Sequence, residues 1–167
     1  LKVSGELKLP ALVGVFRPTI LIPHWLESQD NAERLHWTLR HELTHCKMKD
    51  PLWLLLRRVA TSIFFYHPCI WYAGKKWEDA MELACDRAII TNEDDAHSYA
   101  QSLYKILEYI KGDETMKCAV GLFATRTQIG KRIATLLSGA VKSPARVSII
   151  AILLFLFIPN ELNKSIP

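Results

Sequence analysis

The alternation of hydrophobic and polar residues divides the chain into a short strand-forming region and a longer helical one. Residues 7–23 (LKLPALVGVFRPTILIP) are rich in Val, Ile, Leu and Phe and are interrupted by proline and glycine, which predicts two short strands around a turn at 16–19. Asp30, followed three residues later by Glu33, is a capping-box pattern that opens a helix reaching about Lys49. The apolar stripe of this helix has spacings of four, four and three residues and consists of Leu35, Leu39, Leu43 and Cys46.

Helical patterns continue through most of the remaining sequence. The first segment, 52–66, is apolar nearly all round except for Arg57 and Arg58, and it is broken by His67 and Pro68. The later segments are expected as helices at 68–90, 95–111 and 127–140, with a loop at 112–125. The whole pattern predicts a mainly α protein with a short β-hairpin or sheet, of the α+β class.

A very hydrophobic run lies near the end of the chain. Val147–Ile158 (VSIIAILLFLFI) has twelve uncharged residues and is ended by Pro159. A full membrane span needs about 20 apolar residues, so a packing helix is the alternative interpretation. Basic residues precede the run, as they do at the cytosolic end of a membrane span, namely Lys131, Arg132, Lys142 and Arg146. We therefore interpret it as a transmembrane helix and divide the chain into a domain at 1–141 and a C-terminal hydrophobic or transmembrane segment and tail at 142–167.

Composition and charge narrow the classes of function. Half of the 167 residues are hydrophobic and 23% are charged, which excludes a disordered chain and favours membrane contact or a heavily buried helical core. The net charge of +4 comes without a Lys/Arg block or an RNA-type aromatic motif, so no direct nucleic-acid binding is expected. The four cysteines form no CxxC pair, which predicts reduced thiols.

The strongest chemical signal is the sequence HELTH at 41–45, an HExxH motif inside the predicted first helix. A spacing of four places His41 and His45 one turn apart on one helix face, where both imidazoles can bind one zinc ion. Glu42 lies about one residue further round, close enough to reach a water molecule at that metal. The apolar stripe falls on the opposite side, so we expect the histidines to face a cleft. Two surface histidines with a glutamate between them are the competing interpretation.

A third metal ligand is expected from the helix after Pro68. This helix carries Glu78, Glu82 and Asp86 at successive spacings of four residues. Such an acidic stripe is usually a solvated face, but beside an HExxH motif it becomes the expected source of a carboxylate ligand. Two histidines and one glutamate leave the fourth position of zinc open, which is the catalytic arrangement. An acidic residue one turn beyond the ligand is placed to hydrogen-bond the free ring N–H of a ligating histidine.

Four motifs occur in order with compatible gaps: PALVGVFRPTILIP, HELTHCKMKDP, FYHPCIWYA and ELACDRA. Over about residues 8–140, the chain resembles the zinc metallopeptidase domain of the β-lactam sensor-transducers, the antirepressor family of Gram-positive bacteria. The resemblance implies a gluzincin-type metalloendopeptidase with one Zn²⁺ per chain. It also implies that His41, His45 and Glu82 are the ligands, that Glu42 is the catalytic base and that Asp86 supports a ligand.

The resemblance carries further expectations about setting and partners. In that family the protease domain lies at the cell membrane and faces the cytoplasm, and antibiotic binding at an external sensor leads to self-cleavage and loss of a repressor. The external sensor domain has no counterpart in this chain. We therefore expect a membrane-associated enzyme of signal transduction and antibiotic resistance, which answers a cell-wall antibiotic or a related signal. Its partners would be the lipid membrane and a protein substrate, either a repressor or its own loop.

Two alternative functions remain open. One is a non-catalytic membrane signalling module with a structural zinc, although such a site would not need Glu42 between the histidines. The other is a membrane zinc protease of the prenyl-protein or stress-response type, which shares HExxH and a later ExxxD.

Three further segments are candidates for roles in substrate binding and cleavage. His67 is a candidate oxyanion donor, with a capping or packing histidine at a helix break as the competing interpretation. The strand-forming stretch Leu12–Ile22 is the expected platform for a substrate that binds as an added strand. The loop at 112–125 is long and is expected to pass through the cleft in extended form as an internal substrate. The expected self-cleavage region consists of Gly121, Leu122, Phe123 and Ala124.

Overall fold

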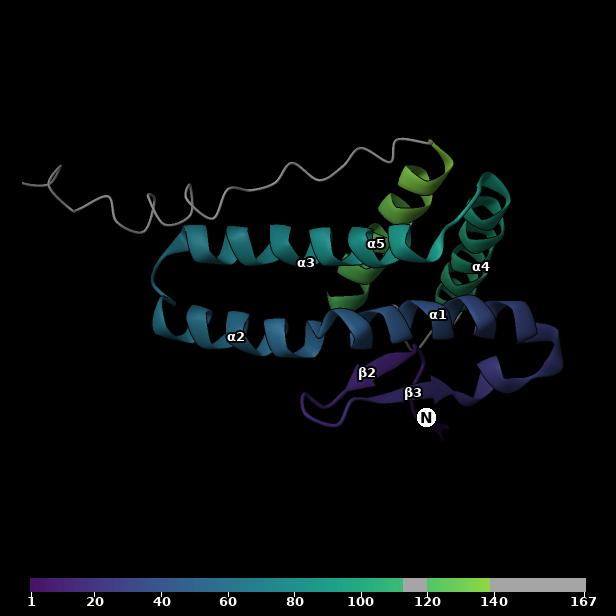
Figure 1. The fold of residues 1–167 in the computed structure, drawn as a ribbon, viewed down its shortest axis with the longest axis horizontal. Helices are drawn as coiled ribbons and strands as arrows, with labels where there is room; N and C mark the ends of the chain where they lie inside the picture. Colours follow the sequence, from purple (N-terminus) through teal and green to yellow (C-terminus); the bar gives the residue numbers. More distant parts are fainter. Residues whose placement is uncertain (113–119, 139–167) are drawn as a thin grey trace, which may run out of the picture.

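The structure is a computed structural model that describes residues 1–112 and 120–138. Its mainly helical architecture with a small sheet confirms the predicted α+β class (Figure 1). The strands are β1 (Lys2–Ser4), β2 (Ala11–Val13) and β3 (Thr19–Pro23), followed by the 3₁₀ turns η1 (His24–Glu27) and η2 (Gln29–Asn31). The helices are α1 (Ala32–Met48), α2 (Asp50–Ile63), α3 (Pro68–Ile89), α4 (Glu93–Gly112) and α5 (Val120–Leu137).

The sheet has the order β1-β3-β2, so β2 forms one of its two edges. β2 and β3 pair antiparallel with Leu12 opposite Ile20, which confirms the predicted hairpin. The turn between them contains Gly14 with a φ of 96°, a conformation that glycine adopts without a Cβ penalty. β1 was not predicted, because three residues without alternation carry no strand signal. It forms by pairing parallel to β3, with Val3 opposite Ile22.

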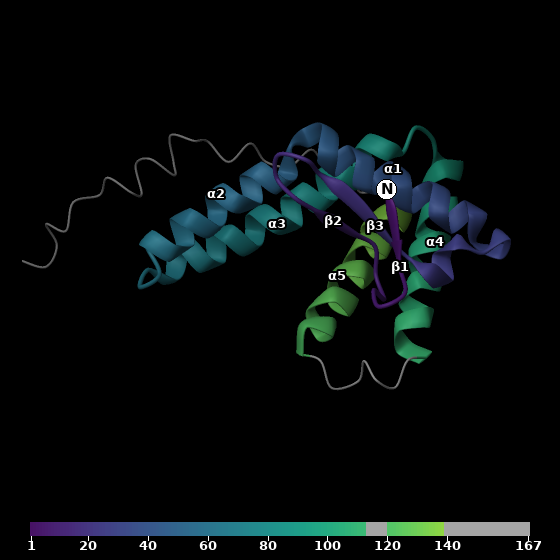
Figure 2. The ribbon, with the colours of Figure 1, turned by 90° about the horizontal axis from the view of Figure 1, so that it is seen from below.

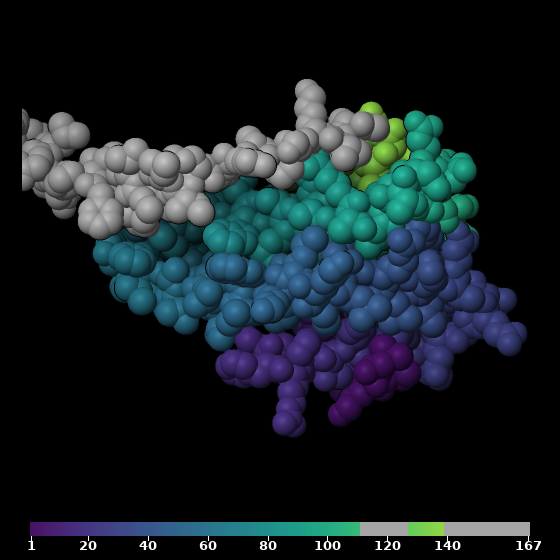
Figure 3. All heavy atoms as spheres, in the orientation of Figure 1, coloured from purple at the N-terminus to yellow at the C-terminus, as the bar shows by residue number. Residues whose placement is uncertain are grey.

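Helix α1 lies between the sheet and the other helices (Figures 1 and 3). On the sheet side, buried Ile20, Ile22 and Leu26 pack against Leu35, Leu39 and Cys46 of α1. The predicted apolar stripe of α1 therefore packs as expected, except for Leu43, which is 56% exposed. On the other side, Trp37 of α1 joins a larger core made mainly by α4 and α5. Both layers hold α1, and with it the HExxH segment, in a fixed place.

Helix α5 begins earlier than predicted. The segment 120–125 forms its first turns, so the predicted loop at 112–125 is wrong in this part. The glycine at 121 suggested a loop, but one glycine costs a helix only about 1 kcal/mol relative to alanine and does not end it. Gly121 to Ala124 consequently lie in a helix, in which peptide bonds are not extended. Self-cleavage at these bonds stays a prediction, and it requires the start of α5 to unwind.

No helix in the described parts of the chain is long and apolar enough to cross a membrane. The apolar α2 has 14 residues, which gives a length of about 21 Å and falls short of the ~30 Å hydrocarbon core of a bilayer. The predicted membrane helix Val147–Ile158 and the segment 142–167 lie outside the described residues.

Candidate active site

The two histidines of the HExxH motif lie on the face of α1 that is turned towards α3. His41 is buried and its ring stands edge-on to that of His45, with 4.6 Å between the ring centroids. Their Nε2 atoms are 3.0 Å apart. The helical spacing therefore brings two imidazole nitrogens to one point, as the sequence predicted.

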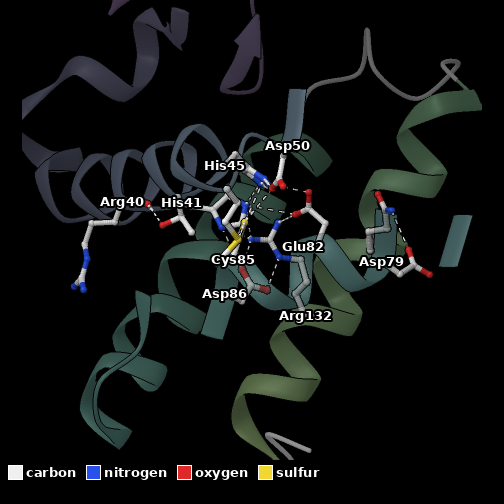
Figure 4. Close-up of polar contacts among 12 residues, drawn as sticks. Arg40, His41, His45, Asp50, Asp79, Glu82, Cys85, Asp86 and Arg132 are labelled. Atoms are coloured by element: carbon white, nitrogen blue, oxygen red, sulfur yellow. Dashed lines mark hydrogen bonds and ion pairs between the residues drawn. The ribbon is translucent and has the colours of Figure 1, made fainter. Parts of the chain in front are cut away.

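Helix α3 supplies one carboxylate to this point. Glu82 Oε2 lies 3.4 Å from His41 Nε2, and its Oε1 lies 3.6 Å from His45 Nε2 (Figure 4). Glu78, one turn earlier, points instead to α2, where Arg57 donates a hydrogen bond to its Oε1. Packing of α2 against α3 therefore separates two carboxylates that the sequence pattern left nearly equivalent.

The three donor atoms suit a zinc ion. Zinc binds histidine nitrogen and carboxylate oxygen at about 2.0–2.2 Å in tetrahedral geometry, which places neighbouring donors about 3.3 Å apart. The observed separations of 3.0, 3.4 and 3.6 Å bracket that value. The donor atoms of His41, His45 and Glu82 all lie within 4.8 Å of one another, so the three side chains are close enough to hold one metal ion.

The second ring nitrogen of each histidine has an acidic partner. His45 Nδ1 lies 2.6 Å from Asp50 Oδ2, and His41 Nδ1 lies 3.3 Å from Asp86 Oδ1. Such partners fix the tautomer and orientation of metal-binding histidines. Asp86 was expected in this place, whereas Asp50 was not. Asp50 reaches His45 because Lys49, in the left-handed region with a φ of 59°, ends α1 and lets α2 begin at once.

Cys85 is buried behind the ligand group. Its Sγ lies 3.2 Å from His45 Nδ1 and 3.5 Å from Asp50 Oδ2, so it faces the outer side of the histidine ring. Burial, reinforced by the negative charge of Asp50, raises the pKa of the thiol well above its usual range. The thiol is therefore protonated and acts as a small buried side chain.

Arg132 from α5 enters the site from the opposite side. Its Nε and Nη2 donate to the two carboxylate oxygens of Asp86 at 2.8 and 2.6 Å, and its Nη1 lies 3.0 Å from Glu82 Oε2. Nη2 also lies 2.5 Å from the hydroxyl oxygen of Tyr99, whose O–H donates to Asp86 at 2.7 Å. Nη2 is almost equally far from Nδ1 and Nε2 of His41, at 3.4 and 3.3 Å, so it does not lie along either lone pair. Arg132 is thus compatible with a metal at Nε2.

Charge and burial set the protonation of the two glutamates. Burial by itself would raise the pKa of Glu82, but the hydrogen bond with His41 and the positive charge of Arg132 outweigh it and lower the pKa to about 2. Glu82 is therefore ionised, as a metal ligand must be. For Glu42, burial is the larger effect and raises the pKa, although the two histidines oppose it.

A cleft of about 360 Å³ opens at the ligand group. Glu42 lies in its wall together with the ligands, and residues 9–12, which include the start of β2, form another part of the wall. The predicted base and part of the predicted substrate platform therefore border one cavity. Helix α4 completes it with Ser102, Leu103 and Ile106.

Comparison with known proteins places this site in a family. The family model described as BlaR1 peptidase M56 matches residues 1–136, which include every site residue described above. The chain belongs to the BlaR1 peptidase M56 family. This confirms the resemblance predicted from the four motifs. Membership of the M56 family supports a metallopeptidase in general and implies a metal, typically zinc.

Curated relatives of this M56 domain include regulatory and resistance proteins. The chain is 29% identical over 143 residues to the regulatory protein BlaR1 of Bacillus licheniformis, covering 84% of this chain and 24% of that protein. It is 25% identical over 104 residues to the methicillin resistance mecR1 proteins of Staphylococcus aureus and Staphylococcus epidermidis, covering 61% of this chain and 18% of those proteins. The chain therefore spans about a quarter or less of the length of these relatives.

The structure does not bring His67 to the M56 site. This residue is exposed and precedes α3 at the far end of the α2–α3 hairpin. Glu82 lies 14 positions after Pro68, the first residue of α3, which corresponds to about 21 Å of helix. This placement favours the competing interpretation of a residue at a helix break, and the role of His67 as an oxyanion donor stays a prediction.

Proposed function

We propose that the chain is the catalytic domain of a membrane-associated zinc metalloendopeptidase that acts in signal transduction. It would cleave itself, a transcriptional repressor, or both, in response to a cell-wall antibiotic or a related signal. The observation that carries the proposal is the convergence of His41, His45 and Glu82 within 3.0 to 3.6 Å, with Glu42 in the wall of the same cleft. The names of the relatives, a regulatory protein and methicillin resistance proteins, support the regulatory setting.

The proposed chemistry assigns one role to each residue. His41, His45 and Glu82 would hold one Zn²⁺, which when bound supplies Lewis acidity for polarising the scissile carbonyl and activating water. Glu42 takes a proton from the attacking water and later delivers it to the leaving amine. Asp50 and Asp86 keep the two imidazoles oriented through their outer nitrogens.

The cleft suggests how a peptide would bind. β2 is an edge strand, so the side of it that faces away from β3 is open to pairing within the described sheet. Residues 9–12 line the same cleft as Glu42. We expect a substrate segment to bind in extended form beside β2, which would place a peptide bond at the metal.

The proposed location is the cell membrane, with the protease domain facing the cytoplasm. Its support is the pair Lys142 and Arg146 just before the hydrophobic run Val147–Ile158, because basic residues accumulate on the cytoplasmic side of membrane spans. Arg132, which the sequence pattern grouped with them, pairs with Asp86 in the site instead. The repressor substrate and the activating antibiotic signal are also proposals, because the chain covers only part of the length of its relatives.

The decisive experiment compares zinc content and proteolysis in Glu42→Gln and the wild-type chain. Wild type loaded with zinc should contain one metal per chain and cleave itself or a repressor, with fragments identified by mass spectrometry. Glu42→Gln should retain the metal and lose cleavage, because it removes only the proton acceptor. If the zinc-loaded wild type cleaves nothing, or if both proteins cleave equally, the zinc is structural and the chain is a signalling module.

A second comparison tests the ligand assignment. Glu82→Gln should lower zinc affinity by more than the 10–100-fold that loss of an outer-sphere partner costs. Glu78→Gln is the matched control, because the same chemical change one turn away affects ion pairs with Arg57 and Lys75 and none with the two histidines. Zinc affinity is measured by competition with a chromophoric chelator. Equal losses in the two variants would refute the choice of Glu82.

A further inference from the structure

The α2–α3 hairpin projects beyond the rest of the described chain (Figures 1 and 2). Its two helices pack on one another, and in both views their outer halves lie away from the other labelled elements. Between Asp50 and Glu78 the sequence contains no acidic residue at all. The hairpin beyond the metal site therefore presents only neutral and basic side chains.

The outer surface of the hairpin is aromatic and aliphatic. Six residues near its tip are between 49% and 69% exposed: Val59, Ile63, Phe65, Tyr66, Trp71 and Tyr72. They belong to the outer ends of α2 and α3 and to the turn between them, and we refer to these six residues as the cap. Soluble monomers rarely expose large apolar patches, and such patches mark interaction surfaces.

Basic residues surround this cap. Arg58 and Lys76 are exposed, and Lys76 lies 5.6 Å from the ring centroid of Tyr72. Lys75 is exposed as well, but its Nζ lies 3.7 Å from Glu78 Oε2 and 3.5 Å from Asp79 Oδ1, so it is paired within α3. Arg57 is not part of this set, because it turns inward to Glu78 and contacts Gly74, where an added Cβ would come within 2.9 Å of Nη1. Arg58 on α2 and Lys76 on α3 are therefore the exposed cations that flank the cap.

We propose that the tip of the α2–α3 hairpin, residues 63–72, docks into the surface of a bilayer that contains anionic lipids. Trp and Tyr favour the membrane–water interface, where the ring lies in the apolar layer and the polar atom stays hydrated. Arg58 and Lys76 complement anionic headgroups. An anionic bilayer suits this surface better than a protein groove, because an exposed cation flanks the aromatic residues on each of the two helices. The hairpin lies in the interface and does not cross the membrane, since α2 is too short.

This docking would set the position of the metal site. Asp50 and Glu82 lie at the root of the hairpin, and α2 separates the root from the tip by about 21 Å. The cleft would therefore stand above the lipid headgroups, within reach of a protein substrate in the aqueous phase. The docking needs neither zinc nor proteolysis, so it stands independently of the proposed catalytic function.

Tryptophan fluorescence tests the proposal directly. The chain has five tryptophans, Trp25, Trp37, Trp53, Trp71 and Trp77, so the hydrophobic run at 147–158 contributes no signal. The full chain is mixed with vesicles of phosphatidylcholine and phosphatidylserine whose acyl chains carry bromine, a quencher of nearby indoles. We expect quenching that Trp71→Phe largely removes, because Trp71 is at the tip. Trp53→Phe is the matched control near the root and should retain the quenching.

Binding measurements complete the test. Flotation with anionic vesicles should be at least tenfold weaker for the double variant Phe65→Ser/Tyr72→Ser, and weaker for Arg58→Glu, whereas neutral vesicles should bind the wild type poorly. Phe16→Ser controls for loss of an exposed aromatic outside the hairpin, since Phe16 is 92% exposed. Glu42→Gln should bind vesicles as the wild type does, which separates this proposal from the catalytic one.

Three results would overturn the docking proposal. Unquenched Trp71 in bound protein would show that another segment, such as 147–158, makes the membrane contact. Equal flotation of the tip variant and the wild type would lead to the same conclusion. A wild-type dimer that the tip variant converts to a monomer, without any lipid dependence, would identify a second copy of the chain as the occupant of the cap.

Discussion

The buried ion pair between Asp86 and Arg132 ties α5 to the metal site, and its loss should be among the most damaging single changes. The side chain of Asp86 is 1% exposed and that of Arg132 is 16% exposed. They share two parallel N–H···O bonds at 2.8 and 2.6 Å. We consider the substitutions Asp86→Asn and Arg132→Met, alone and together.

Each single substitution leaves one buried charge without its partner, which costs about 3–5 kcal/mol of unfolding free energy. The loss of unfolding free energy for Arg132→Met should lie near the upper end of this range, because the substitution leaves both Asp86 and Glu82 without their cation. Asp86→Asn should lie near the lower end, because Arg132 keeps Glu82 and the amide oxygen can still accept from Tyr99. The double variant should cost less than the sum of the singles by about 0.5–3 kcal/mol, since it removes both charges.

The assay is urea unfolding followed by tryptophan fluorescence, with a chelator and a mild detergent present so that metal binding does not contribute. Asp79→Asn is the matched control: it breaks the exposed pair with Lys75 and should cost no more than about 1 kcal/mol. Single variants within about 1 kcal/mol of the wild type would refute the reasoning. Strict additivity of the double variant would refute the coupling.

Three smaller predictions follow from the structure. Asp50→Asn should lower zinc affinity about 10–100-fold in a chelator competition, because His45 loses its charged partner; unchanged affinity would show that α1 alone orients the ring. Leu26→Ala should lower the unfolding free energy by about 2–5 kcal/mol, because Leu26 is fully buried beneath the sheet; a denaturant midpoint close to the wild type would contradict this. Lys49→Gly should raise the unfolding free energy by up to about 1 kcal/mol, because glycine accepts the left-handed conformation; a lower midpoint would argue against strain at this residue.

Local periodicity was sufficient to predict one half of the site. The spacing of four in HELTH places His41 and His45 on one face of any α-helix, and Glu42 then follows beside them. The hairpin of β2 and β3 was predictable for the same reason, because its strands and its turn are adjacent in the chain. The fold class followed from these local patterns.

Where carboxylates and cations meet across helices was decided by tertiary packing. The acidic stripe of α3 offered Glu78 and Glu82 at equivalent positions, and only the contact of Glu78 with Arg57 on α2 left Glu82 facing the histidines. Arg132 lies 91 residues from His41 in the sequence and belongs to no recognisable motif. The sequence around it therefore gave no indication that α5 would place it beside His41.

The same distinction explains where the structure departs from the sequence pattern. His67 follows the HExxH motif by about 20 residues, yet helix α2 carries the chain to the far end of the hairpin before His67 is reached. Asp50 was passed over because its role depends on the left-handed turn at Lys49, which directs the start of α2 back to His45. Side-chain periodicity is a property of one helix and can be read from the chain. The meeting of several helices depends on their packing against a common core, and that arrangement became visible only in three dimensions.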